Sequence, residues 1–101
     1  MKRILTAVRD IKTEVYLPVM EYANAEDCKR NMAQAINDPR AQMIYHYPED
    51  YEIYHIANWN NSSGDIEPLI EAVLICNCKE LKVEDTKNIV PLQKEEKVNN
   101  G

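Results

Sequence analysis

The sequence predicts a small α+β domain in which one antiparallel sheet carries a single helix on one face, in the order β-β-α-β-β. The chain has 101 residues, enough for one hydrophobic core and too few for a second. Alternating runs typical of strands occur in two pairs, at residues 3–22 and 51–76, and an apolar stripe with helical spacing separates them. The last stretch is charged and poor in large apolar side chains, so we expect a domain at 1–78 and a disordered, flexible tail at 79–101.

The first pair of strands is expected at residues 3–10 and 15–22. The first run is rich in Ile, Leu, Thr and Val, and alternation resumes in the second after a short polar connection. Pro18 has no N–H to donate to a sheet, so the second strand should lie at an edge or carry a bulge. We expect the two runs to form an antiparallel hairpin.

Residues 25–37 form the expected helix. Asn24 can cap its N-terminus, and the carboxylate of Asp27 can reach back to the same end. Apolar residues recur at the spacing of one helix face; they are Cys28, Met32, Ala35 and Ile36. Asn37-Asp38-Pro39 ends the helix, because the residue before a proline is pushed away from helical geometry.

The second pair of strands follows a connecting loop at residues 40–50. Residues 51–59 alternate, so one face of this strand should carry a common set of side chains; these are Tyr51, Ile53, His55, Ala57 and Trp59. Gly64 can supply a positive φ in the next turn. Residues 66–76 form the last expected strand, which Pro68 interrupts.

The composition argues against several kinds of function. Three cysteines without a secretory signal do not form a disulfide framework, so Cys28 is expected in the core and Cys76 and Cys78 as reduced thiols on a strand. Neither histidine has the spacing of a metal ligand, and we expect no metal and no cofactor. Two glycines cannot build a phosphate-binding loop, and no nucleophile–base pair is evident, so an enzyme is not expected.

The chain is also expected to be soluble and to have no contact with a membrane. No apolar run approaches the roughly 20 residues that a membrane-spanning helix needs. Charges at Arg9 and Asp10 leave the opening apolar stretch too short for a signal peptide. A cytosolic protein follows from these two observations.

Charge and aromatic side chains nevertheless suggest a nucleic-acid interface. The net charge of −5 argues against a strongly basic binder, but no Lys or Arg occurs at 41–78, so the cations of the expected domain all lie in its first 40 residues. Candidates for phosphate contacts are Arg3, Arg9, Lys12, Lys29, Arg30 and Arg40. Aromatic rings stack on unpaired bases, each for about 1–3 kcal/mol. Candidates for stacking are Tyr45, Tyr47, Tyr54 and Trp59. Alternatively, the tyrosines form the core and its rim, because the chain has no Phe.

Three short motifs carry a resemblance to a known family. They are Asn37-Asp38-Pro39 at the end of the helix, Pro48-Glu49-Asp50-Tyr51 before a strand, and Gly64-Asp65-Ile66 in the next turn. With them the chain resembles the small nonstructural protein of gokushoviruses, microviruses with small single-stranded DNA genomes that infect bacteria. The resemblance covers about residues 2–70 and departs at Tyr47, where the family usually has His, and at the turn 59–63.

The resemblance implies a protein that is absent from the virion, lies in the cytoplasm of the bacterial host, and binds DNA during single-strand synthesis or packaging. Two functions stay open. One is a non-catalytic accessory protein that binds single-stranded DNA through the six cations and four rings named above. The other is an interaction module that engages a viral replication or capsid protein, or a host factor, without binding DNA. A homodimer formed by edge pairing of residues 15–22 is compatible with either.

Overall fold

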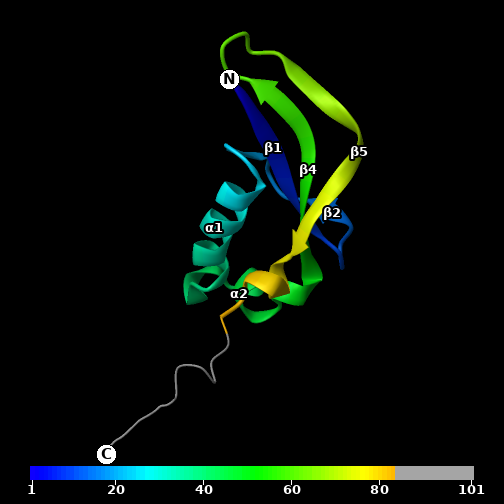
Figure 1. The fold of residues 1–101 in the computed structure, drawn as a ribbon. Coiled ribbons are helices and arrows are strands. Elements are labelled where there is room, and N and C mark those ends of the chain that lie inside the picture. Colours follow the sequence, from blue (N-terminus) through cyan, green and yellow to red (C-terminus); the bar gives the residue numbers. More distant parts are fainter. Residues whose placement is uncertain (84–101) are drawn as a thin grey trace, which may run out of the picture.

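The strands of residues 1–83, the part of the chain that this computed structural model describes, form one antiparallel sheet of five strands. Figure 1 shows the sheet with its main helix lying against one side. The elements are β1 (Lys2–Asp10), β2 (Val15–Tyr16), β3 (Met20–Tyr22), α1 (Ala25–Ile36), η1 (Pro39–Ala41), α2 (Met43–His46), η2 (Pro48–Asp50), β4 (Tyr51–Asn60), β5 (Ile66–Asn77) and η3 (Cys78–Leu81), the η elements being short 3₁₀ helices. The expected α+β class, with an antiparallel sheet and one main helix, is confirmed.

The order of the elements differs from the expected β-β-α-β-β at the second strand. β1 pairs on one side with both β2 and β3 and on the other side with β4, and β5 pairs with β4 at the far edge. The expected strand at 15–22 is therefore two short strands, because Pro18 between them has no N–H for the ladder. The N–H of Leu17 still donates to the carbonyl of Val8 at 2.7 Å. As expected, Pro18 lies at an edge of the sheet.

α1 forms because its first turn is capped twice. The side chain of Asn24 accepts a hydrogen bond from the N–H of Asp27 at 2.8 Å, and the Asp27 carboxylate accepts one from the N–H of Ala23 at 3.3 Å. Three residues of the expected apolar stripe, Cys28, Met32 and Ile36, then pack on the sheet, whereas Ala35 is exposed. The buried cluster consists of Val8, Cys28, Met32, Ile36, Tyr51, Ile53, Cys76 and Cys78. The face of the sheet that meets α1 is called the covered face below.

A bulge in β4 changes which side chains share a face. Leu5 pairs with Ala57, but the next residue, Thr6, pairs with His55, so Ile56 has no partner in β1. Directly opposite residues point to the same face, and successive residues of β1 point to opposite faces. His55 therefore lies on the covered face and Ala57 on the other. The expectation that Tyr51 through Trp59 present one continuous set on one face is wrong beyond His55.

The segment expected to be a loop at 40–50 contains two 3₁₀ helices and α2. The Asp38 carboxylate accepts a hydrogen bond from the N–H of Arg40 at 2.9 Å and so caps η1. Pro39 and Pro48 occupy the first positions of η1 and η2, where a missing N–H costs nothing. Pro39, which follows the end of α1, and Pro48 thus each begin a short 3₁₀ helix.

The chain beyond β5 remains part of the fold. The side-chain amide of Asn37 donates to the carbonyl of Leu81 at 3.0 Å, and its oxygen accepts from the N–H of Val83 at 2.9 Å. The ammonium group of Lys82 donates to the carbonyl of Tyr45 at 2.9 Å. Residues 79–83 therefore belong with the domain, past the expected boundary at 78, and the rest of the expected tail, 84–101, lies outside the described residues.

Candidate nucleic-acid interface

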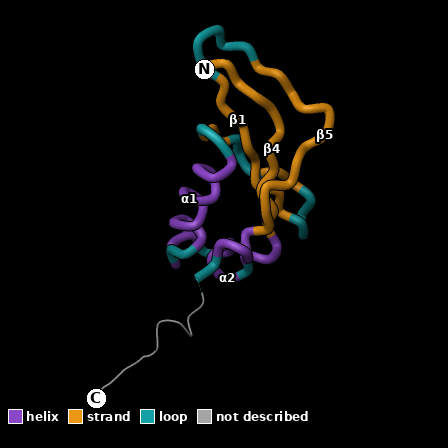
Figure 2. The backbone as a smooth tube through the Cα atoms, viewed as in Figure 1, coloured by secondary structure: helices purple, strands orange, loops and turns teal. Residues whose placement is uncertain are grey.

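The face of the sheet opposite α1 has no helix against it among residues 1–83. Figure 2 shows α1 on one side of the strands and α2 at the end of the sheet. The pairing register assigns the side chains of this face, because opposite residues share a face. They include Arg3, Leu5, Ala7 and Arg9 of β1, Tyr16 of β2, Glu21 of β3, and Glu52, Tyr54, Ala57 and Trp59 of β4. This surface is called the open face.

One end of the open face carries a cluster of two tyrosines and a guanidinium group. Arg9 lies directly opposite Tyr16, and its guanidinium carbon is 6.0 Å from the centre of that ring. The ring of Tyr16 meets the ring of Tyr54 edge-on, with centroids 6.1 Å apart. The hydroxyl of Tyr54 donates to Glu52 at 2.9 Å, and this bond to the carboxylate raises the pKa of Tyr54. The cluster draws on three strands.

The other end of the open face carries Arg3 and Trp59, which lie opposite each other in the β1–β4 register. Arg3 forms an ion pair with Glu21 of β3. Arg3 and Arg9 are six positions apart along the extended strand β1, or about 20 Å at the usual rise of a strand. The open face therefore offers two groups, each made of a guanidinium and at least one ring, along one line of the sheet.

Four of the ten sequence-predicted residues are brought together on the open face, namely Arg3, Arg9, Tyr54 and Trp59. Lys12 lies in the exposed turn that joins β1 to β2, beyond the Arg9 end. The other five lie on α1 or in the segment after it; they are Lys29, Arg30, Arg40, Tyr45 and Tyr47. The predicted set thus separates into an open-face group and a helical group.

The helical group is largely occupied by partners of its own. Lys29 pairs with Glu26 and Arg30 with Asp27 along α1. Arg40 binds both carboxylate oxygens of Asp38, with the shortest contact at 2.7 Å. This ion pair holds the pKa of Asp38 down at about 2 and raises that of Arg40.

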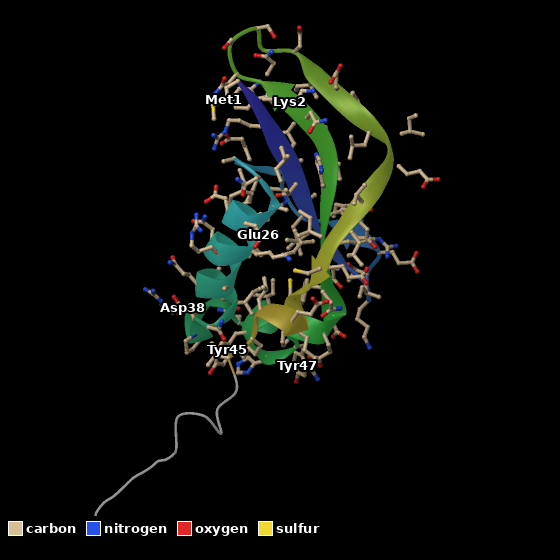
Figure 3. All side chains as sticks on the ribbon, in the orientation of Figure 1. Met1, Lys2, Glu26, Asp38, Tyr45 and Tyr47 are labelled. Atoms are coloured by element: carbon tan, nitrogen blue, oxygen red, sulfur yellow. The ribbon has the colours of Figure 1, made fainter. Side chains whose placement is uncertain are left out.

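The two tyrosines of the helical group lie in α2 and just after it, outside the strands that form the open face. The ammonium of Lys82 is 3.4 Å from the centre of the Tyr45 ring, so one side of that ring is occupied. The ring of Tyr47 is exposed. Figure 3 shows Tyr45 and Tyr47 at the end of the molecule opposite Lys2.

Sequence reasoning missed Tyr16 as a site residue. The signal was present in the hairpin register: a four-residue connection at 11–14 places Val15 opposite Asp10, and therefore Tyr16 opposite Arg9. Tyr16 also explains how the cluster holds together, because it contacts both Arg9 and Tyr54.

The electrostatics of the open face are balanced rather than basic. Arg3 pairs with Glu21, and Arg9 lies opposite Glu52 in the register. No carboxylate of residues 1–83 forms an ion pair with Arg9. The surface is therefore mainly aromatic, with Arg9 as the guanidinium most available to an anion.

The hollow, the cysteines and the histidine described next, all within residues 1–83, include none of the ten sequence-predicted site residues. A hollow of about 480 Å³ at the hairpin end contains none of the ten predicted residues; it is lined by Lys2, Asn58, Asn60, Asp65, Ile66 and Glu67. The thiols of Cys28, Cys76 and Cys78 are buried, and burial raises the pKa of each. His55, on the covered face, has its Nε2 at 3.0 Å from the side-chain oxygen of Asn58. None of the helices in residues 1–83 is both long and apolar enough to cross a membrane.

The folded region from β1 through η3 is also the part of the chain that is similar to a known family. A family model described as "Phage ORF5 protein" matches residues 4–81, from β1 through η3. No curated protein matches the chain, and no solved structure does. The matched range ends with η3, which agrees with the packing of residues 79–83 on the domain.

Proposed function

The chain belongs to the Phage ORF5 protein family, and from this premise we propose that it is a non-catalytic accessory protein that binds single-stranded DNA on the open face of its sheet. In this proposal it is a gokushovirus nonstructural protein, acts in the cytoplasm of the bacterial host during genome replication or packaging, and is not part of the virion. The observation that carries the proposal is the gathering of three rings and two guanidinium groups on one uncovered face, from residues far apart in the sequence.

Stacking would supply most of the affinity. Rings on a sheet face can stack on the bases of a single strand, which are free to splay out, whereas paired bases present no free flat surface. Tyr54 and Trp59 lie on the same face of β4 at the two ends of the open face. The proposal therefore requires a preference for single-stranded over double-stranded DNA.

Phosphate contacts would contribute less. Arg9 is unpaired among residues 1–83, Lys12 lies in an exposed turn beyond it, and Arg3 would have to share its guanidinium with Glu21. Two or three phosphate contacts correspond to a slope of about −1.4 to −2.1 for the logarithm of the binding constant against the logarithm of salt concentration. This shallow dependence fits a chain with net charge −5.

The proposal is tested through Trp59, which is the sole Trp of the chain. Its fluorescence should fall when an unlabelled oligothymidine is added, and labelled single strands should bind more tightly than duplexes of the same length in anisotropy. Tyr54→Ala should weaken binding about 5-fold to 150-fold, the range that corresponds to one lost stack. Arg9→Gln should weaken binding and make the salt slope shallower by about 0.7.

Arg40→Gln is the matched control, because Arg40 is exposed and lies outside the open face. It removes the same charge as Arg9→Gln and should leave the affinity for DNA unchanged. Equal losses in the two arginine variants would mean that only net charge matters, and absence of binding at low salt would exclude the proposal.

A second function is favoured by the balanced charge of the open face. The alternative is an interaction module that engages a viral replication or capsid protein, or a host factor, through this aromatic surface. Tyr and Trp are enriched at protein interfaces as well as at stacking sites. In this case a partner would be captured by the wild type and lost in Tyr54→Ala, while oligonucleotides would not bind at physiological salt.

A further inference from the structure

The two edges of the sheet differ in how readily another strand could pair with them. The edge opposite β5 is made of β2 and β3, which have two and three residues and are separated by Leu17, Pro18 and Val19. A short, proline-broken edge is a poor template for pairing. The other edge is β5, a single strand of 12 residues with β4 on one side and no strand of residues 1–83 on the other.

β5 carries exposed apolar side chains along this free edge. Ile70 is fully exposed, and Ile66, Val73 and Leu74 expose between 49% and 58% of their surface. β5 contains no Lys or Arg, the residues that most often protect such an edge. Its protecting features are Pro68, which offers no donor, and the two carboxylates of Glu67 and Glu71.

The middle of β5 is also held less closely by its neighbour. The register with β4 jumps from Ala57–Pro68 to His55–Val73, so residues 69–72 have no partner in β4. Figure 1 shows β5 arching away from β4 in this part of the sheet. Backbone groups in this stretch can therefore turn toward a strand on the outer side at little cost to the β4–β5 ladder.

The side chains of β5 are complementary to a second copy of the same strand. Around a two-fold axis at Ile70, antiparallel pairing places Ile70 opposite itself, Ile66 opposite Leu74, and Pro68 opposite Ala72. All of these are apolar and fall on one face of the new pair. The charges are also compatible, because Glu67 then lies opposite Val73 and Glu71 opposite Leu69. No acidic residue of one copy lies directly opposite an acidic residue of the other.

We propose that two copies of this chain associate through antiparallel β5–β5 pairing around Ile70, which joins their sheets into one continuous sheet. The pairing is assigned to β5 rather than to residues 15–22, since the latter are broken at Pro18. Nine residues, 66–74, give a contact about 30 Å long. One strand pair is expected to bury less than the roughly 1,200–2,000 Å² of a standard interface, so the dimer should dissociate on dilution.

Sedimentation velocity of the full chain over a dilution series tests the association. The wild type should pass from 11.7 kDa at low concentration to twice that mass at high concentration. Ile70→Lys should stay monomeric, because the axis would place two ammonium groups against each other. Ile70 contacts little within one copy, so this variant should fold normally.

Val15→Lys is the matched control at the other edge, where Val15 is 56% exposed. It should dimerise like the wild type. A wild type that stays at 11.7 kDa at every concentration, or equal effects of the two lysine variants, would overturn the proposal.

A cross-link tests the position of the axis. The native cysteines are all buried, so Ile70→Cys adds the one accessible thiol of the described residues. Opposite residues of an antiparallel pair have Cα atoms about 4.5–5.5 Å apart, within the range for a disulfide. Oxidised glutathione should therefore convert Ile70→Cys, but not Val15→Cys, to a disulfide-linked dimer on a non-reducing gel. Equal cross-linking of the two would contradict an axis at Ile70.

The dimer and the proposed DNA binding can fail separately. DNA binding by Ile70→Lys, measured by Trp59 quenching, reports on the open face of a single copy. A dimer that binds no DNA would remove only the proposed function, and a monomer that binds DNA would remove only the dimer.

Discussion

The two faces of the sheet are built from the same strands and yet differ in what stabilises them. On the covered face, Ile53 and Cys76 are buried against Cys28 and Ile36 of α1. On the open face, the ring of Tyr16 contacts the ring of Tyr54 on one side and the guanidinium group of Arg9 on another, at the molecular surface. The covered face therefore provides the hydrophobic core, while the open face presents the exposed ring of Tyr16 and the partly exposed rings of Tyr54 and Trp59.

The difference shows that apolar alternation alone does not identify the core of this domain. An antiparallel sheet with one wet face normally has polar residues on that face. Here the open face includes Leu5, Ala57 and Trp59. An apolar face without a helix against it is typical of an interaction surface, so the two faces should respond differently to the same kind of mutation.

The largest difference should come from truncating one side chain on each face. Ile53→Ala should lower the free energy of unfolding by about 2–5 kcal/mol, because it leaves a cavity in the buried cluster. Leu74→Ala should cost less than about 1 kcal/mol, since Leu74, which lies opposite Tyr54 on the open face, is already 49% exposed. Urea denaturation followed by circular dichroism measures both. Similar losses would mean that the open face is covered in solution.

The sequence predicted the covered face well because the signals for it are local. Asn24 and Asp27 cap α1 as expected, and Cys28, Met32 and Ile36 point into the core at the expected spacing. These features depend on neighbours within one or two helical turns, which a sequence displays directly.

The open face could be predicted only in part, because it depends on strand register. The bulge at Ile56 moves Ala57 and Trp59 to the face opposite His55, and no turn or breaker residue marks it. The hydrogen bonds of the Asn37 side chain with Leu81 and Val83 were likewise not predictable, because they join segments more than 40 positions apart. Of the site residues, Trp59 and Tyr54 were predicted from residue type, but their grouping with Arg9 required the pairing of three strands.

Alkaline pH should lower the free energy of unfolding, because ionisable thiols are buried in the cluster of the covered face. Burial, followed by the neighbouring Cys76, raises the pKa of Cys78 to about 12. The free energy of unfolding is therefore unaffected by this thiol's ionisation below the unfolded thiol's pKa of about 8.5. As pH rises from there toward the folded pKa, the unfolded state ionises first, and stability falls by up to about 1.4 kcal/mol per pH unit. Urea midpoints measured from pH 8 to pH 11 should therefore fall.

Cys78→Ala tests whether this thiol is responsible. The variant should be less stable at pH 8 but should lose stability less steeply as the pH rises. Cys28, Cys76 and Tyr51 also have pKa values raised by burial, so a residual slope is expected. An unchanged slope would assign the alkaline loss to those groups instead.

A smaller effect is expected from the cap of α1. Asn24→Ala removes the acceptor for the N–H of Asp27 and should lower the free energy of unfolding by about 1 kcal/mol. The loss should appear in the thermal midpoint, and the Trp59 emission of the folded protein should stay the same, because Trp59 lies on the other face. Asn24→Asp keeps an acceptor and is the control. A change in Trp59 emission would show that α1 controls the geometry of the open face as well.

The smallest effect should come from the ion pair of Asp38 and Arg40, which lies at the surface with the Arg40 side chain 90% exposed. Hydrogen bonds from the Arg40 side chain and backbone lower the pKa of Asp38 to about 2. Because this lies below the unfolded value of about 3.9, the pair stabilises the fold above that pH and its effect is lost as pH falls through about 2.

Arg40→Gln should raise the pKa of Asp38 in a carbon-13 NMR titration, although the Arg40 N–H still lowers it. Arg30→Gln removes a similar ion pair on α1 and should leave that titration unchanged. Solvent screening makes such a surface pair weak, so Arg40→Gln should shift the titration of Asp38 without a measurable change in the urea midpoint at pH 7, in contrast to Ile53→Ala.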